Sequence, residues 1–125
     1  MIRGIRGATT VMVNQEVDIL NETEQLFEAI ADQNEIDPED VAQVLITVTE
    51  DLNATFPAKA MRRLSGWDFV PVTCAKELSV PGSLPQCVRI LMTVNTSKSQ
   101  KEIHHVYLNE AVKLRPDLIK TSTNS

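Results

Sequence analysis

A positively charged side chain interrupts the most strand-like run in the sequence. Residues 87–94 read Cys-Val-Arg-Ile-Leu-Met-Thr-Val, which places Arg89 among apolar neighbours in a segment typical of a β-strand. A guanidinium cannot lose its proton to escape burial. The fold must therefore provide Arg89 with a carboxylate, a set of carbonyl oxygens or an anionic ligand.

The composition predicts one small domain with an aliphatic core. The chain has 125 residues, of which 42% are hydrophobic and 4% aromatic, so Val, Ile, Leu and Met must fill most of the core. The formal net charge is -5, and Arg62-Arg63 is the most basic segment. This charge balance argues against nucleic acid as a partner.

The N-terminus and the cysteines indicate a cytoplasmic protein without a membrane segment. No charged leader precedes an apolar stretch, and no run of about 18 apolar residues is present. Cys74 and Cys87 show neither a CxxC pattern nor the spacing of metal ligands. We therefore expect free thiols in a reducing compartment.

Hydrophobic periodicity predicts an α+β fold with a mixed sheet of four to five strands, one long helix and one or two short helices. Strands are expected at residues 2–11, 44–48, 69–74 and 87–96, with a short strand or turn at 106–107. The long helix should begin at an N-cap on Asn14 and run to about Asn34. Its sheet-facing side is expected to carry Val17, Leu20, Phe27 and Ile30. Short helices are expected after Asp37, at 56–64 and within 108–114.

The expected strands differ in how they are buried. The continuous apolar run 44–48 predicts a strand buried on both faces. Pro71 cannot donate to a ladder and should confine strand 69–74 to an edge or a strand end. In strand 87–96, Val88 begins an apolar face with every second residue, so Arg89 should point to the other face.

Familiar catalytic motifs are absent from the sequence. It contains no GxSxG, P-loop, GxGxxG or HExxH pattern. His104 and His105 are adjacent and point in different directions, so they cannot chelate one metal ion together. Cys74 could be a nucleophile at a strand end, but no histidine lies near it in the sequence, and a small buried thiol is the expected role.

Arg6 and Arg89 are the strongest candidates for a functional pair. Two arginines in apolar strands of one small domain are costly unless both face a common anion. Each could instead pair with a carboxylate such as Glu77 or Asp51. Glu77 itself is either a solvated loop acid or one wall of a site, and Tyr107 is either a half-buried core residue or a ligand contact.

Short motifs in a fixed order link the chain to a known family. They are IRGIRGAT at 2–9, FPAKA at 56–60, GW at 66–67, VPVTC at 70–74, Glu77, CVR at 87–89 and HVYL at 105–108. In this order and spacing, they closely resemble the small monofunctional chorismate mutases of the trimeric α/β-barrel class. The likeness extends to about Leu118, which implies a chorismate mutase domain at 1–118 and a flexible C-terminal tail at 119–125.

The resemblance implies an isomerase of aromatic amino acid biosynthesis. It would convert chorismate to prephenate, on the way to phenylalanine and tyrosine, by a Claisen rearrangement within one substrate molecule. Neither a cofactor nor a metal is implied. The resemblance also implies a homotrimer, in which sheets from the three chains form a pseudo α/β-barrel and each active site lies between two neighbours.

The same resemblance assigns roles to individual residues. Arg89 is expected to stabilise the charge that grows on the ether oxygen, Glu77 to accept from the ring hydroxyl, and Arg6 and Tyr107 to bind substrate carboxylates. The ring side of the site is expected to carry Thr73, Cys74 and Glu77, and Ala75 and Lys76 are also expected to bind substrate. Its outer wall is expected to carry Phe56, Ala58, Lys59, Arg62, Leu114 and Arg115.

Two other functions remain open on the residues alone. A trimeric enamine or imine deaminase also holds a carboxylate with an interfacial arginine, although the Gly-Pro-Tyr-Ser-type segment of that family is missing here. A non-catalytic module that senses an anion would need Arg6 and Arg89 but would have no use for Glu77 opposite them.

Overall fold

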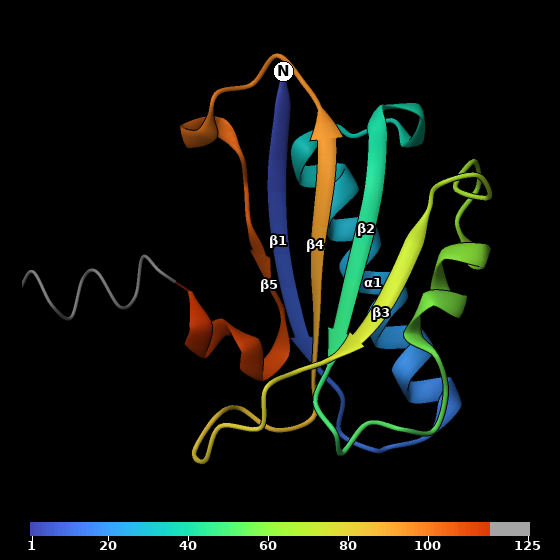
Figure 1. Ribbon diagram of the computed structural model, residues 1–125, viewed down its shortest axis with the longest axis vertical. Helices are drawn as coiled ribbons and strands as arrows, with labels where there is room; N and C mark the ends of the chain where they lie inside the picture. The colour runs from blue at the N-terminus through green and yellow to red at the C-terminus, as the bar shows by residue number, and fades with distance from the viewer. Residues whose placement is uncertain (116–125) are drawn as a thin grey trace, which may run out of the picture.

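The computed structural model describes residues 1–115, which form a five-stranded mixed sheet with one long helix packed against it (Figure 1). The strands and the helix are β1 (Ile2–Thr10), α1 (Glu16–Asn34), β2 (Val41–Val48), β3 (Val72–Lys76), β4 (Cys87–Asn95) and β5 (Val106–Tyr107). The 3₁₀ segments are η1 (Pro38–Asp40), η2 (Pro57–Arg63), η3 (Gln100–Glu102) and η4 (Asn109–Leu114). The α+β prediction is confirmed, and the predicted tail at 119–125 lies outside the described residues.

The sheet has the order β3-β2-β4-β1-β5, with β4 at its centre. β4 runs antiparallel to β1 and β2, whereas β3 is parallel to β2 and β5 is parallel to β1. This register places Arg89 between Ala8 of β1 and Thr47 of β2. The strand after Pro71 is an edge strand, as predicted, and the Pro71 carbonyl accepts from the backbone N–H of Val44 at 2.9 Å.

One face of the sheet packs on α1, which lies behind the strands in Figure 1. The apolar face predicted for β4 is buried there, since Val88, Ile90, Met92 and Val94 are at most 1% exposed. A Cβ on Gly7 would lie 2.6 Å from Cδ1 of Ile30, so a larger residue would force the Ile30 side chain or the strand to shift, and glycine allows the close approach. None of the described helices is long and apolar enough to cross a bilayer.

The opposite face, called here the open face, is covered mainly at its β5 end. There Ala111 and Leu114 of η4 pack with Ala8 and Tyr107. Elsewhere on this face Leu45 is 36% exposed and Leu91 43% exposed. The prediction that strand 44–48 is buried on both faces is therefore wrong for this chain, because α1 covers one side and no described helix covers the other side at β2.

The start of α1 differs from the prediction. Gln15 occupies the N-cap position without a side-chain cap, and the Asn14 side chain instead accepts from the backbone N–H groups of Asn53 and Ala54. Val17 is 56% exposed, and the buried face of the helix is formed by Ile19, Leu20, Thr23, Leu26, Phe27, Ile30 and Asn34. Asn14 thus ties the loop after β2 to the helix start rather than capping the helix.

The start of the third strand shifts for reasons of long-range packing. The third strand begins at Val72 rather than Phe69, which is 99% exposed. Trp67 is buried against Phe27 with ring centroids 5.7 Å apart, so the residues after it turn before the strand begins. The short helices predicted around Pro57 and Ala111 are present as 3₁₀ segments.

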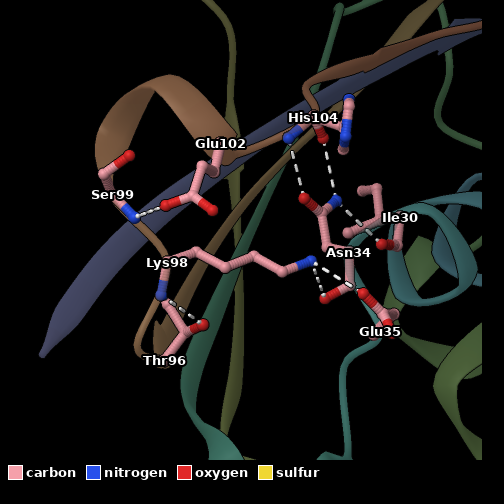
Figure 2. Close-up of polar contacts among 8 residues, drawn as sticks. All are labelled: Ile30, Asn34, Glu35, Thr96, Lys98, Ser99, Glu102 and His104. Carbon is pink, nitrogen blue, oxygen red and sulfur yellow. Dashed lines mark hydrogen bonds and ion pairs between the residues drawn. The ribbon is translucent and has the colours of Figure 1, made fainter.

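A buried amide connects the end of α1 to the segment before β5 (Figure 2). Asn34 is 1% exposed, and its Nδ2 donates to the carbonyl oxygens of Ile30 at 2.9 Å and His104 at 2.8 Å. Its Oδ1 accepts from the backbone N–H of His104 at 2.8 Å. Lys98 closes the same corner by donating to the Asn34 carbonyl at 3.0 Å. Both backbone groups of His104 are therefore satisfied by one side chain, which fixes the chain two residues before β5.

Candidate active site

A pocket of about 280 Å³ opens on the open face of the sheet, at the junction of β1, β2, β4 and β5. Three of its lining residues are polar or charged groups that the sequence predicted for the site, Arg6, Arg89 and Tyr107. The other lining residues are Gly7, Ala8, Leu45, Thr47, Ile90, Leu91 and Leu114. An apolar floor with a few converging polar groups is typical of a site for a small ligand.

Arg89 is held in this pocket beside a carboxylate. Its Nε lies 3.4 Å from Oε1 of Glu77, and the two side chains are 40% and 21% exposed, respectively. Nε itself is buried, and no group of residues 1–115 accepts a hydrogen bond from it. Arg89 lies on the face away from the apolar core, as predicted, and is half-buried beside a carboxylate neighbour that leaves its Nε donor unused.

Glu77 follows β3 directly and continues its pairing with β2. Its backbone N–H donates to the Val48 carbonyl at 2.8 Å, and its Oε2 accepts a hydrogen bond from the hydroxyl of Thr47. Thr47 stands opposite Arg89 in the β2 and β4 pairing. Glu77 is therefore a half-buried, hydrogen-bonded acid just beyond β3 rather than a freely solvated one.

Arg6 and Tyr107 approach the pocket from the other side. Arg6 pairs with Leu91 across β1 and β4, and Tyr107 pairs with Ala8 across β1 and β5. The backbone N–H of Arg6 donates to Nδ1 of His105 at 3.0 Å. Partial burial of the ring, helped by the positive charge of Arg6, lowers the pKa of His105, which keeps Nδ1 free to accept.

A second hollow, of about 530 Å³, lies between η2 and the edge strand β3. It gathers other residues that the sequence predicted for the site, namely Phe56, Lys59, Cys74, Ala75 and Lys76. Lys59 donates there to Oε2 of Glu16 at 3.0 Å. Cys74 packs against the main core, and burial raises the pKa of its thiol, so it remains protonated near neutral pH.

The remaining predicted residues lie around these two hollows. Thr73 pairs with Leu45 and so belongs to the open face, while Ala58 packs against the core and Arg62 is exposed. Arg115 lines a further depression together with Tyr107 and both histidines. Within residues 1–115, no three His, Cys, Asp or Glu side chains gather in a metal-binding arrangement.

Comparison with known proteins shows the family. The family model for chorismate mutase type I matches residues 2–118. The chain belongs to the chorismate mutase type I family. The chorismate mutase AroH of Bacillus subtilis is 56% identical over 121 residues, covering 97% of this chain and 95% of the relative. The AroH of Thermus thermophilus is 47% identical over 119 residues, with 94% and 97% covered.

A solved structure agrees with the fold. A chorismate mutase from Clostridium thermocellum superposes with a TM-score of 0.86 at 45% sequence identity, covering 89% of this chain and 98% of that one. The motifs from which the resemblance was drawn therefore pointed to the correct family.

In this chorismate mutase, the predicted site residues form two groups rather than one. The open-face pocket brings together Arg6, Arg89, Tyr107 and Leu114, with Glu77 against Arg89. The residues of the second hollow lie around the edge strand β3. The two hollows share no lining residue and meet at β2, where Thr47 lines the first and the adjacent Val48 lines the second. One chain thus carries the predicted site residues in two separate hollows.

Sequence reasoning missed Thr47. Its hydroxyl contacts Glu77 from 30 positions away, and this contact depends on the parallel pairing of β2 with β3. A signal existed, because Thr47 is the polar residue in the apolar run 44–48, but an isolated threonine in a strand also suits simple β-propensity.

Proposed function

We propose that this chorismate mutase binds chorismate in the open-face pocket and rearranges it to prephenate, with Arg89 as the donor to the ether oxygen. The observation that carries this assignment is the buried Nε of Arg89, which has no hydrogen-bond acceptor among residues 1–115 although it lines a pocket. An unsatisfied charged donor costs about 1–3 kcal/mol or more. A substrate oxygen in the pocket would remove that cost.

The reaction suits a site that holds donors but no activated nucleophile. A Claisen rearrangement breaks one bond and forms another within the bound substrate, so the protein must restrain the reactive conformation and stabilise developing charge. Negative charge grows on the ether oxygen as its bond to the ring lengthens. Arg89 meets that charge, and the rearrangement requires neither a metal ion nor a cofactor.

The other polar groups would orient the substrate, a dianion. Arg6 and Tyr107 stand on the far side of the pocket from Glu77 and would bind carboxylates. The Glu77 carboxylate would accept from the ring hydroxyl and complement the partial positive charge of the ring. An anion-sensing module has no comparable need for a carboxylate beside Arg89.

We further infer a homotrimer whose active sites form between subunits. The division of the predicted residues between two surfaces of one chain supports this arrangement, because the η2 side of one subunit can complete the open-face pocket of its neighbour. The exposed Leu45 and Leu91 give the open face apolar surface suited to such packing. We also propose a single catalytic domain at 1–118 and a cytoplasmic location.

Incubation of the purified protein with chorismate, in a buffer with a metal chelator and no cofactor, tests the proposal. We expect chorismate to disappear and prephenate to accumulate in equal amounts. Absence of turnover by folded trimer would contradict it. Binding of chorismate without turnover would instead favour the anion-sensing function, and release of ammonia from an imine substrate would favour the deaminase.

A further inference from the structure

We propose that Thr47 is a positioning residue of this active site, because it holds the Glu77 carboxylate in an orientation that leaves Arg89 available to the substrate. This inference rests on the proposed roles of Arg89 and Glu77. Thr47 lines the pocket and stands opposite Arg89 in the sheet, with its side chain half-buried on the open face.

The two oxygens of Glu77 have different neighbours. Oε2 accepts from the Thr47 hydroxyl, whereas Oε1 lies 3.4 Å from Nε of Arg89 without a hydrogen bond. Among residues 1–115, Thr47 is the one residue whose side chain donates a hydrogen bond to this carboxylate. The hydroxyl therefore decides which way the carboxylate plane is turned.

The alternative orientation would compete with the substrate. Arginine and carboxylate groups prefer a bidentate pair with two parallel N–H···O bonds, each of which is roughly twice as strong as a hydrogen bond between neutral groups. Formation of that pair by Glu77 would use both of its oxygens and would occupy the donors of Arg89. With Oε2 turned toward the Thr47 hydroxyl, only Oε1 faces Arg89, so the bidentate geometry is absent and Nε remains unpaired among residues 1–115.

The backbone alone cannot enforce this orientation. The bond from the Glu77 N–H to the Val48 carbonyl, at 2.8 Å, fixes the position of the residue at the end of β3. The side chain beyond it has several rotatable bonds, and its only hydrogen bond within the described part of the chain is the one from Thr47. Removal of that hydroxyl should allow the carboxylate to swing onto Arg89.

Two substitutions at Thr47 distinguish the effect of the hydroxyl on kcat from the effect of side-chain shape. Thr47→Val keeps the branched shape and removes the donor, and we expect kcat to fall roughly ten- to hundredfold, as for loss of a hydrogen bond to a charged group. Thr47→Ser keeps the donor, and we expect kcat within about threefold of the wild type. Thr93 lies on β4, on the same face of the sheet as Thr47, but does not line this pocket. Thr93→Val is therefore the matched control and should retain wild-type kcat.

A double-mutant cycle with Glu77→Ala tests whether Thr47 acts through Glu77. In the Glu77→Ala background, Thr47→Val should have no further effect on kcat, because the group that it positions is gone. An equal loss of kcat in both backgrounds would assign Thr47 a merely structural role and overturn the proposal. If wild-type protein turns over chorismate and Thr47→Val does so at the same rate, the positioning role fails while the proposed function stands.

A crystal structure of Thr47→Val gives a readout independent of activity. We expect Glu77 to move into a bidentate pair with Arg89, so that Nε gains a carboxylate acceptor. A carboxylate that keeps its wild-type position would overturn the proposal even if the protein had another activity.

Discussion

Arg89 and Glu77 face each other at an Nε to Oε1 distance of 3.4 Å, and no hydrogen bond joins these two atoms. The arrangement keeps opposite charges close while a strong donor remains unused. In a half-buried site, such a donor interacts more strongly with a developing charge than it would in water. Without substrate, the Nε donor of Arg89 therefore lacks an acceptor among residues 1–115, and a substrate oxygen would provide one.

Replacement of Arg89 by lysine tests the need for a planar donor. Lysine keeps the positive charge but loses the guanidinium plane and its fixed donors, so we predict a loss in kcat of about a hundredfold or more. The measurement is steady-state kinetics of prephenate formation. A rise in KM with unchanged kcat would show that Arg89 binds substrate and transition state equally, contrary to the proposed role.

A matched control uses another arginine in a salt bridge. Arg63 donates to Glu24 at 3.0 Å and to Asn21 at 2.8 Å, on the α1 side of η2, and lines neither of the two hollows. Arg63→Lys should leave kcat within about twofold of the wild type, since exposed pairs contribute about 0–1 kcal/mol.

Mixing of two inactive variants tests whether the sites are shared between subunits. Arg89→Ala removes a group of the open-face pocket, and Lys59→Glu reverses a charge in the second hollow. If each site combines these surfaces from two chains, equal mixing in trimers should restore about a quarter of wild-type activity. Lack of recovery in mixed trimers, verified by native mass spectrometry, would place both surfaces in one subunit's site.

The sequence allowed prediction of those features that depend on local alternation. Val88 and Arg89 were correctly placed on opposite faces of β4, because neighbouring residues of a strand alternate. The run 44–48 was misjudged at Leu45, since an apolar run does not reveal whether one or both faces are covered within the chain. The contact of Thr47 with Glu77 was missed because it forms only when β2 and β3 pair.

Asn34→Asp tests the buried amide that anchors the segment before β5. Aspartate has nearly the same shape but cannot donate to the carbonyls of Ile30 and His104, and its charge would be buried. We predict that the free energy of unfolding falls by about 3 kcal/mol or more at neutral pH. Denaturant unfolding measures this loss.

The control for this substitution lies on the same helix. Asn21 is exposed and accepts from Arg63 through Oδ1, a contact that aspartate retains, so Asn21→Asp should change stability by less than about 0.5 kcal/mol. Equal stabilities of Asn34→Asp and wild type would mean that the amide does not hold this segment.

His105 predicts a specific dependence of stability on pH. Burial and then the charge of Arg6 lower its pKa from the ordinary value of 6.5, so the unfolded chain binds a proton more readily than the folded chain. Between the lowered value and 6.5, the free energy of unfolding therefore rises with pH, and above this window the histidine contributes no pH dependence. Protonation of Nδ1 would also end the bond from the Arg6 N–H.

His105→Asn isolates this contribution, because the asparagine Oδ1 can accept from the Arg6 N–H but does not titrate. Thermal unfolding of both proteins at pH 7.5 and 5.5 provides the measurement. The wild type should lose more in Tm than the variant as the pH falls, by about 1–3 °C for a partly exposed group in a domain of this size. The contribution of carboxylate titration to the change in Tm is the same in both proteins and cancels when they are compared. An equal or larger loss in the variant would mean that His105 is not held in its neutral form by the fold.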